Sequence, residues 1–184
     1  VHYYRADTGT VIYIGDPVYL APTVYVTIGS AAPSMIPYLG IAVGFAGTNK
    51  AGIAGPDPFF DVSDFAPPTP SSDTGDRYIA VADDPNQRFL VQEDTGGTAL
   101  ALADVGATID LVRRTTRGST ETGWAHIEID ASTVVTTTAG VLQILGLADK
   151  VNSDGTQNAV GDYAKWVVRI LHHELRGGTT GTSV

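Results

Sequence analysis

The stretch TGWAHIEIDAS, residues 122–132, decides the fold class, because its apolar and polar residues alternate one by one. In a β-strand, successive side chains point to opposite faces of the sheet. One face of this segment would carry Ala125, Ile127 and Ile129, and the other face would carry Trp124, His126, Glu128 and Asp130. We therefore expect a half-exposed strand whose first face packs on a core and whose second face meets water.

His126 and Glu128 form an H-x-E pattern, which raises the question of a zinc site. A zinc deaminase would also need a Cys-x-x-Cys pair, and the chain has no cysteine. The other histidines that could complete a metal site, His2, His172 and His173, are distant in sequence, and HHEL at 172–175 lacks the spacing of HExxH. We predict no catalytic residue, no cofactor-binding residue and no metal ligand.

Composition narrows the class of protein further. The chain has 184 residues, of which 43% are hydrophobic and 17% charged, as expected for a globular protein. The formal net charge of −9 argues against a nucleic-acid partner, since phosphate binding needs clustered Lys and Arg. No apolar run reaches the roughly 20 residues that span a bilayer, and we expect neither a membrane partner nor a signal peptide.

Short apolar runs broken by Gly, Pro, Asp and Asn indicate many short strands joined by turns. We predict an all-β fold, a barrel or sandwich of short strands, with at most one short helix at 99–106. The run at 39–45 contains two glycines, which indicates a bulge or a close backbone neighbour. Residues 115–123 are predicted as a loop, and 163–175 as a strand or a helix, with β-branched residues favouring the strand. The other predicted strands are 10–14, 23–28, 77–82, 88–93 and 107–112, and the apolar segment 141–148 is predicted to be buried.

Residues 47–76 have a different character, with five prolines that forbid a continuous ladder or helix. Phe59, Phe60 and Phe65 lie between these prolines and need a surface to pack on. The segment is either an arm lying across a neighbouring subunit or a long loop packed on its own domain. The chain thus divides into 1–46, the arm 47–76 and a main β domain 77–184, with the first and last forming one compact unit.

Several weak motifs follow one another in the second half: FLVQEDTGG at 89–97, ADVG at 103–106, STETGWAHIEIDAS at 119–132 and AKWVV at 164–168. Their order resembles the capsid decoration or cement proteins of short-tailed bacteriophages, over about residues 77–175. The resemblance implies a β-rich subunit, commonly a homotrimer, on the outer surface of the virion. There it binds the major capsid protein and stabilises the head.

On this resemblance we expect a structural virion protein that is not an enzyme and needs no cofactor. Its partners would be other copies of itself and the major capsid protein. Aromatic and arginine side chains dominate interface energies. The predicted contact residues are accordingly Phe59, Phe60 and Phe65 in the arm, Arg113, Arg114 and Arg117 in the loop, and Tyr3 and Tyr4 near the N-terminus.

Two functions of other classes stay open at this point. One is a carbohydrate- or host-binding β module of a phage fibre, for which Trp124 and Tyr163 would supply the aromatic platform. The other is a small hydrolase that uses His126 with Glu128 or Asp130. A concave site lined by exposed aromatic rings would favour the first, and converging ionisable groups in a cleft would favour the second.

Overall fold

The computed structural model describes residues 1–5, 12–21, 26–28, 37–48, 54–55, 77–118 and 123–176. This part of the chain is all-β, with two single-turn 3₁₀ helices, η2 (Leu102–Asp104) and η3 (Glu174–Arg176). The strands are β1 (His2–Arg5), β2 (Pro17–Leu20), β3 (Val26–Ile28), β4 (Gly40–Thr48), β5 (Ala54–Gly55), β6 (Arg77–Ala82), β7 (Phe89–Gln92), β8 (Thr108–Gly118), β9 (Ala125–Val135), β10 (Leu142–Leu147) and β11 (Lys165–Ile170). The predicted fold class is thus confirmed.

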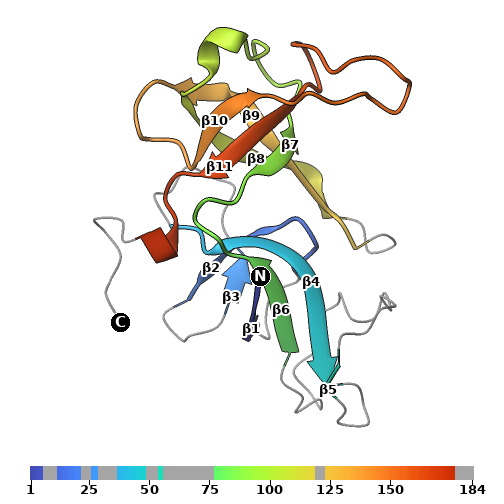
Figure 1. Cartoon of the computed structure of the whole chain (residues 1–184), viewed down its shortest axis with the longest axis vertical. Coiled ribbons are helices and arrows are strands. Elements are labelled where there is room, and N and C mark those ends of the chain that lie inside the picture. Colours follow the sequence, from blue (N-terminus) through green and yellow to red (C-terminus); the bar gives the residue numbers. More distant parts are fainter. Residues whose placement is uncertain are drawn as a thin grey trace.

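The first sheet is antiparallel and has the order β1-β6-β4-β2-β3, with β5 paired to the far end of β4. It forms the lower part of the molecule in Figure 1. Strand β6, between β1 and β4, comes after the predicted arm in sequence and pairs with the whole of β1, from His2↔Val81 to Arg5↔Tyr78. The sheet is therefore built from both sides of the Pro-rich segment.

The second sheet is also antiparallel, with the order β7-β11-β10-β8-β9, and forms the upper part of Figure 1. Its two outer strands meet, because Glu93 forms a bridge with Ile129 and the Asp94 N–H donates to the Ile129 carbonyl at 3.0 Å. The five strands thus close into a small barrel around Trp166, Ile129 and Ile144, which are fully buried. Closure leaves no free edge between β7 and β9 at this point.

Each sheet has its own apolar core, and the two cores meet at neighbouring residues. Tyr38 packs in the barrel core, whereas Leu39 packs in the core of the first sheet together with Val18 and Ile79. The segment around Ile14 adds a second connection, since its N–H donates to Gly123 at 2.9 Å and its carbonyl accepts from Ala125 at 2.8 Å. We call the region where the two parts touch the joint.

Most of the predicted strands are present. The predicted strand 77–82 corresponds to β6, the short helix at 99–106 contains η2, and 163–175 contains strand β11 rather than a helix. The segment 141–148, predicted to be buried, contains β10 and several core residues. The two-glycine run at 39–45 has both predicted features. The β4 register shifts between Ala42 and Gly44, and a Cβ on Gly40 would collide with the carbonyl of Ala82.

Two of the predicted segments are wrong. Residues 10–14 were expected to form a strand, but Ile12 and Tyr13 are in no strand and Ile14 makes only a single bridge, to Trp124. The Asp16 carboxylate accepts the Tyr13 N–H at 2.9 Å, so a side chain replaces the ladder partner there. The predicted loop 115–123 is also shorter, because β8 continues to Gly118 and pairs with Ala125. Its β-branched threonines suit this extended hairpin.

The predicted arm lies mostly outside the described residues. Its first residues, Gly47 and Thr48, end β4 and pair with Gly55 and Ala54 of β5. Residues 56–76, with the three phenylalanines, are not described. The division of the chain at this arm stays a prediction. Among the residues that the structure describes, none belongs to a helix that is long and apolar enough to cross a membrane.

Candidate functional site

Buried carboxylates are the most chemically distinctive groups in the described chain, and each has a structural hydrogen-bonding role. Glu93, fully buried at the end of β7, accepts the Leu100 N–H at 2.7 Å and the Trp166 indole N–H at 2.8 Å. Burial raises the pKa of Glu93, and the two hydrogen bonds oppose that rise. The side chain joins β7, β11 and the loop that returns to η2.

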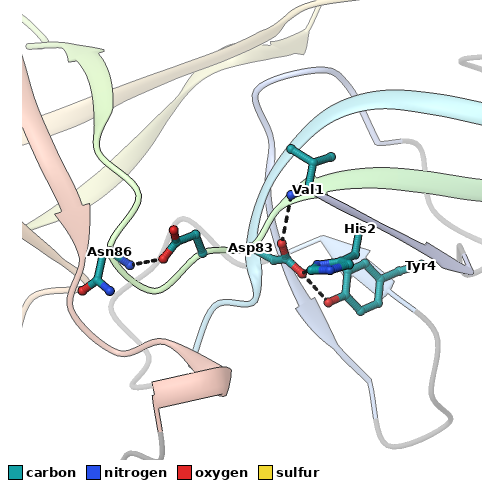
Figure 2. Close-up of polar contacts among 6 residues, drawn as sticks. Val1, His2, Tyr4, Asp83 and Asn86 are labelled. Carbon is teal, nitrogen blue, oxygen red and sulfur yellow. Dashed lines mark hydrogen bonds and ion pairs between the residues drawn. The ribbon is translucent and has the colours of Figure 1, made fainter.

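Asp83 performs the same task at the end of β6, beside the joint. Figure 2 shows its carboxylate meeting His2 and Tyr4 of β1. The Oδ2 atom accepts the Tyr4 hydroxyl at 2.5 Å and lies 2.6 Å from His2 Nδ1, while Oδ1 lies 3.6 Å from the Val1 amine. Burial by itself would raise the pKa of Asp83, but the hydrogen bonds from Tyr4 and His2 outweigh it, and the pKa is lowered.

The H-x-E pair in β9, His126 and Glu128, is less exposed than the alternation predicts. Trp124 is 59% exposed, as expected for the wet face, but Glu128 is only 7% exposed. That part of the prediction is wrong, because β7 lies against β9 and Gln92 donates its amide to Glu128 at 3.0 Å. His126 is partly buried on the same strand. In the described ranges, no three His, Cys, Asp or Glu side chains gather closely enough to hold a metal ion.

The histidine pair after β11 splits between surface and interior. His172 contacts the Thr138 carbonyl at 3.0 Å, and His173 is 2% exposed. These residues begin a segment, 172–176, that leaves the barrel and docks on the first sheet; we call it the C-terminal clamp. Figure 1 shows it descending from β11 to η3 beside that sheet.

The C-terminal clamp contacts the rest of the joint at three places. The Tyr38 N–H donates to His172 at 2.9 Å, and the Tyr38 carbonyl accepts from Glu174 at 3.0 Å. The Glu174 carboxylate accepts the Leu20 N–H at 2.9 Å. The Arg176 guanidinium donates to the Pro85 carbonyl and to the Asn86 side chain, both at 2.8 Å, in the connection between β6 and β7. The clamp therefore ties the barrel to β2, to the entry of β4 and to this connection.

The predicted contact residues lie in different environments. Tyr3 is exposed on β1, whereas its neighbour Tyr4 packs against the core of the first sheet and donates to Asp83. Arg113 is partly buried in β8, and its charge acts on Tyr38, whose pKa burial raises to about 12. Two further predicted residues, Arg114 and Arg117, belong to β8, but their side chains lie outside the described set, as do Phe59, Phe60 and Phe65.

One face of the first sheet is apolar and partly exposed. The β1–β6 register directs His2 and Tyr4 to the side of Val81 and Ile79, which are buried, so Tyr3 points to the opposite side. There Tyr3 is paired with Ala80, which in turn is paired with Gly44 of β4, and the diagonal neighbour of Tyr3 is Tyr78. We call this surface, formed by Tyr3, Gly44, Tyr78 and Ala80, the outer face.

The exposure of the outer face comes from its aromatic residues. Tyr3 is 56% exposed and Tyr78 is 38% exposed, while Val43, in the adjacent bulge of β4, is exposed as well. Ala80, between the two tyrosines, is itself buried at 7% exposure, so the accessible part of this face is formed mainly by the two tyrosines and Val43. Sequence reasoning missed Tyr78, although the alternation in RYIAVA at 77–82 could have placed it opposite Ile79.

The comparisons with known proteins give no relative. No family model, no curated protein and no solved structure matches the chain.

Proposed function

We propose that this protein is a structural virion component, a capsid decoration or cement protein that binds the outside of the major capsid protein shell and stabilises the head. The proposal joins two kinds of support: the order of the motifs in residues 77–175, and an architecture suited to adhesion. Other copies of the chain, as a homotrimer, and the major capsid protein are its proposed partners.

The buried ionisable groups favour a mechanical role. Glu93, Asp83 and Asp110 each accept hydrogen bonds that fix strand ends: from Leu100 and Trp166, from Tyr4, and from the Val141 N–H. A general acid or base needs a geometry that reaches a substrate. Carboxylates that already bind the protein's own donors serve the fold, and they stiffen it against deformation.

The outer face is the single observation that carries the adhesive role. Exposed tyrosines are typical anchors of protein interfaces, because they bury a large area at low conformational cost. Tyr3 on β1 and Tyr78 on β6 are diagonal neighbours on this face, and both side chains are exposed. We propose that this face contacts the shell or a neighbouring subunit.

The test is a binding measurement with two surface variants. The mass of the wild-type assembly is first measured by native mass spectrometry, and we expect an oligomer. It is then mixed with assembled shells of the major capsid protein from the same virus and sedimented. Wild type should co-sediment, and Tyr3→Ser with Tyr78→Ser should bind at least about tenfold more weakly, the effect of losing a hot-spot anchor.

Val151→Ser provides the matched control, since Val151 is another exposed apolar side chain, located on the barrel. It should bind shells like wild type. A persistent monomer that does not bind shells would refute the decoration function. Normal binding by the double tyrosine variant would refute the outer face as the contact, and equally weak binding by the control would also count against a contact specific to that face.

A carbohydrate-binding module is the second candidate, because both aromatic residues predicted for it are exposed. Trp124 precedes β9 beside Ile14, and Tyr163, 50% exposed, precedes β11. They belong to separate parts of the barrel rather than to one platform. Glycan-array binding that Trp124→Ala abolishes would favour this function over decoration.

A further inference from the structure

We propose that the C-terminal clamp is a pH-sensitive latch between the barrel and the first sheet, closed while His173 is neutral and opened when its buried ring takes up a proton. The inference does not depend on the proposed shell binding, and its test uses the isolated protein. It follows from the position of His173, from the hydrogen bonds of its ring and from the charges around it.

The hydrogen bonds of His173 define its neutral form. The ring nitrogen Nδ1 accepts the Leu175 N–H at 3.1 Å, so the proton of a neutral ring is on Nε2. Nε2 is buried and has no hydrogen-bond partner among the described residues. A second proton would have to be placed on Nδ1, facing the N–H of Leu175. The charged ring would then have two N–H donors and no acceptor for either, in a site that is 2% exposed.

The surrounding charges do not remove this penalty. Burial lowers the pKa of His173, and Arg176 in the same clamp lowers it further. Asp83 and Asp84, in the connection that the clamp grips, act in the opposite direction, but the net shift is downward. A histidine whose pKa is lowered in the closed state stabilises that state above its ordinary pKa, and the stabilisation is lost as the pH falls below it.

Protonation of Glu174, the next residue of the clamp, has the opposite effect on the closed state. Burial raises its pKa, while the hydrogen bond from the Leu20 N–H lowers it, and its second oxygen, Oε2, is buried without a partner in the described chain. Protonation of Glu174 therefore favours the closed clamp as the pH falls. Glu174→Gln removes this effect and retains an oxygen for Leu20, so the variant isolates the response of His173.

Asp83 titrates outside the relevant pH range. Its pKa is lowered from an ordinary value of 3.8, so the stability that it contributes is lost only in stronger acid. The joint also keeps other connections when the clamp opens, namely the bonds of Ile14 to Gly123 and Ala125. Opening should therefore be local, and should free the backbone of Tyr38 and the Leu20 N–H.

Amide hydrogen exchange measures this opening directly. The reporters are the backbone amides of Tyr38, Leu20 and residue 174. Their exchange rates are measured by NMR at pH 7.5 and 5.5 and corrected for the intrinsic exchange rates. If His173 has its ordinary pKa of 6.5 in the open state and stays neutral in the closed state, the open population rises about tenfold between pH 7.5 and 5.5. We expect this increase in Glu174→Gln, with the Ile14 amide as an internal reference that does not change.

Three variants separate the histidines. His173→Asn keeps an acceptor for Leu175 and cannot titrate, so the tenfold change should disappear, whereas His172→Gln and His2→Gln should retain it. If His173→Asn does not fold, the titration of the His173 ring is followed instead by its imidazole NMR chemical shifts in Glu174→Gln. A His173 ring that titrates at its ordinary pKa while the reporter amides stay equally protected would overturn the proposal. Unchanged exchange in Glu174→Gln, or a tenfold change that persists in His173→Asn, would also overturn it.

Discussion

Removing the buried carboxylate of Glu93 should be among the most damaging single changes in the barrel. The variant Glu93→Ala leaves the Leu100 N–H and the Trp166 indole N–H without their acceptor, in a site that is fully buried. Each unsatisfied buried donor costs roughly 1–3 kcal/mol. We therefore expect the free energy of unfolding to fall by about 2–6 kcal/mol, a large share of the roughly 5–15 kcal/mol typical of a domain.

Glu93→Gln gives a graded comparison. Its amide has one acceptor oxygen for two donors, so the expected loss is about half, roughly 1–3 kcal/mol. The pKa of Glu93 is raised in the folded state. The wild-type protein therefore gains stability relative to Glu93→Gln as the pH falls from neutral toward the ordinary glutamate pKa, because only the wild type can take up the proton.

Urea unfolding followed by tryptophan fluorescence provides the assay. The chain has two tryptophans, and Trp124→Phe removes the exposed one, leaving Trp166 as a reporter that contacts Glu93 directly. A double-mutant cycle with Trp166→Phe, read by circular dichroism, should show coupling to Glu93. If Glu93→Ala costs less than about 1 kcal/mol and the cycle is additive, the assigned role of this carboxylate is wrong.

Three further variants test the joint and the loops. Gly40→Ala should lower the urea midpoint strongly, because its Cβ would collide with the Ala82 carbonyl; an unchanged midpoint would contradict the close strand approach. Asn158→Ala removes the side chain that bonds Ala148 and both backbone groups of Lys165, and should cost about 2–4 kcal/mol with faster amide exchange around residues 149–164. Asp83→Asn should lower the free energy of unfolding at neutral pH. The wild-type carboxylate has a lowered pKa, so its contribution to stability is lost as the pH falls below the ordinary pKa of 3.8, and the variant should lose less stability in that range. Acid-unfolding curves of equal steepness for the two proteins would count against this.

Local pattern was sufficient for the fold class. Alternation in the 77–82 and 124–130 runs, β-branched residues in 165–170 and paired glycines in 39–45 each concern neighbours along the chain, and each corresponds to a strand or a bulge. Such features depend on side-chain direction and backbone freedom, which a few adjacent residues set. The absence of cysteine likewise excludes thiolate metal sites without any structure.

Only the tertiary structure could decide how those strands combine. Glu128 has the periodicity of a wet-face residue, yet it is buried because β7 happens to lie against β9. His172 and His173 are adjacent in sequence, but one contacts the Thr138 carbonyl at the surface and the other is only 2% exposed. Burial and hydrogen-bond partners come from residues distant in sequence, such as Tyr4 and Asp83. Sequence alone therefore determined a β protein made of short strands, and packing between distant segments determined which polar groups became buried.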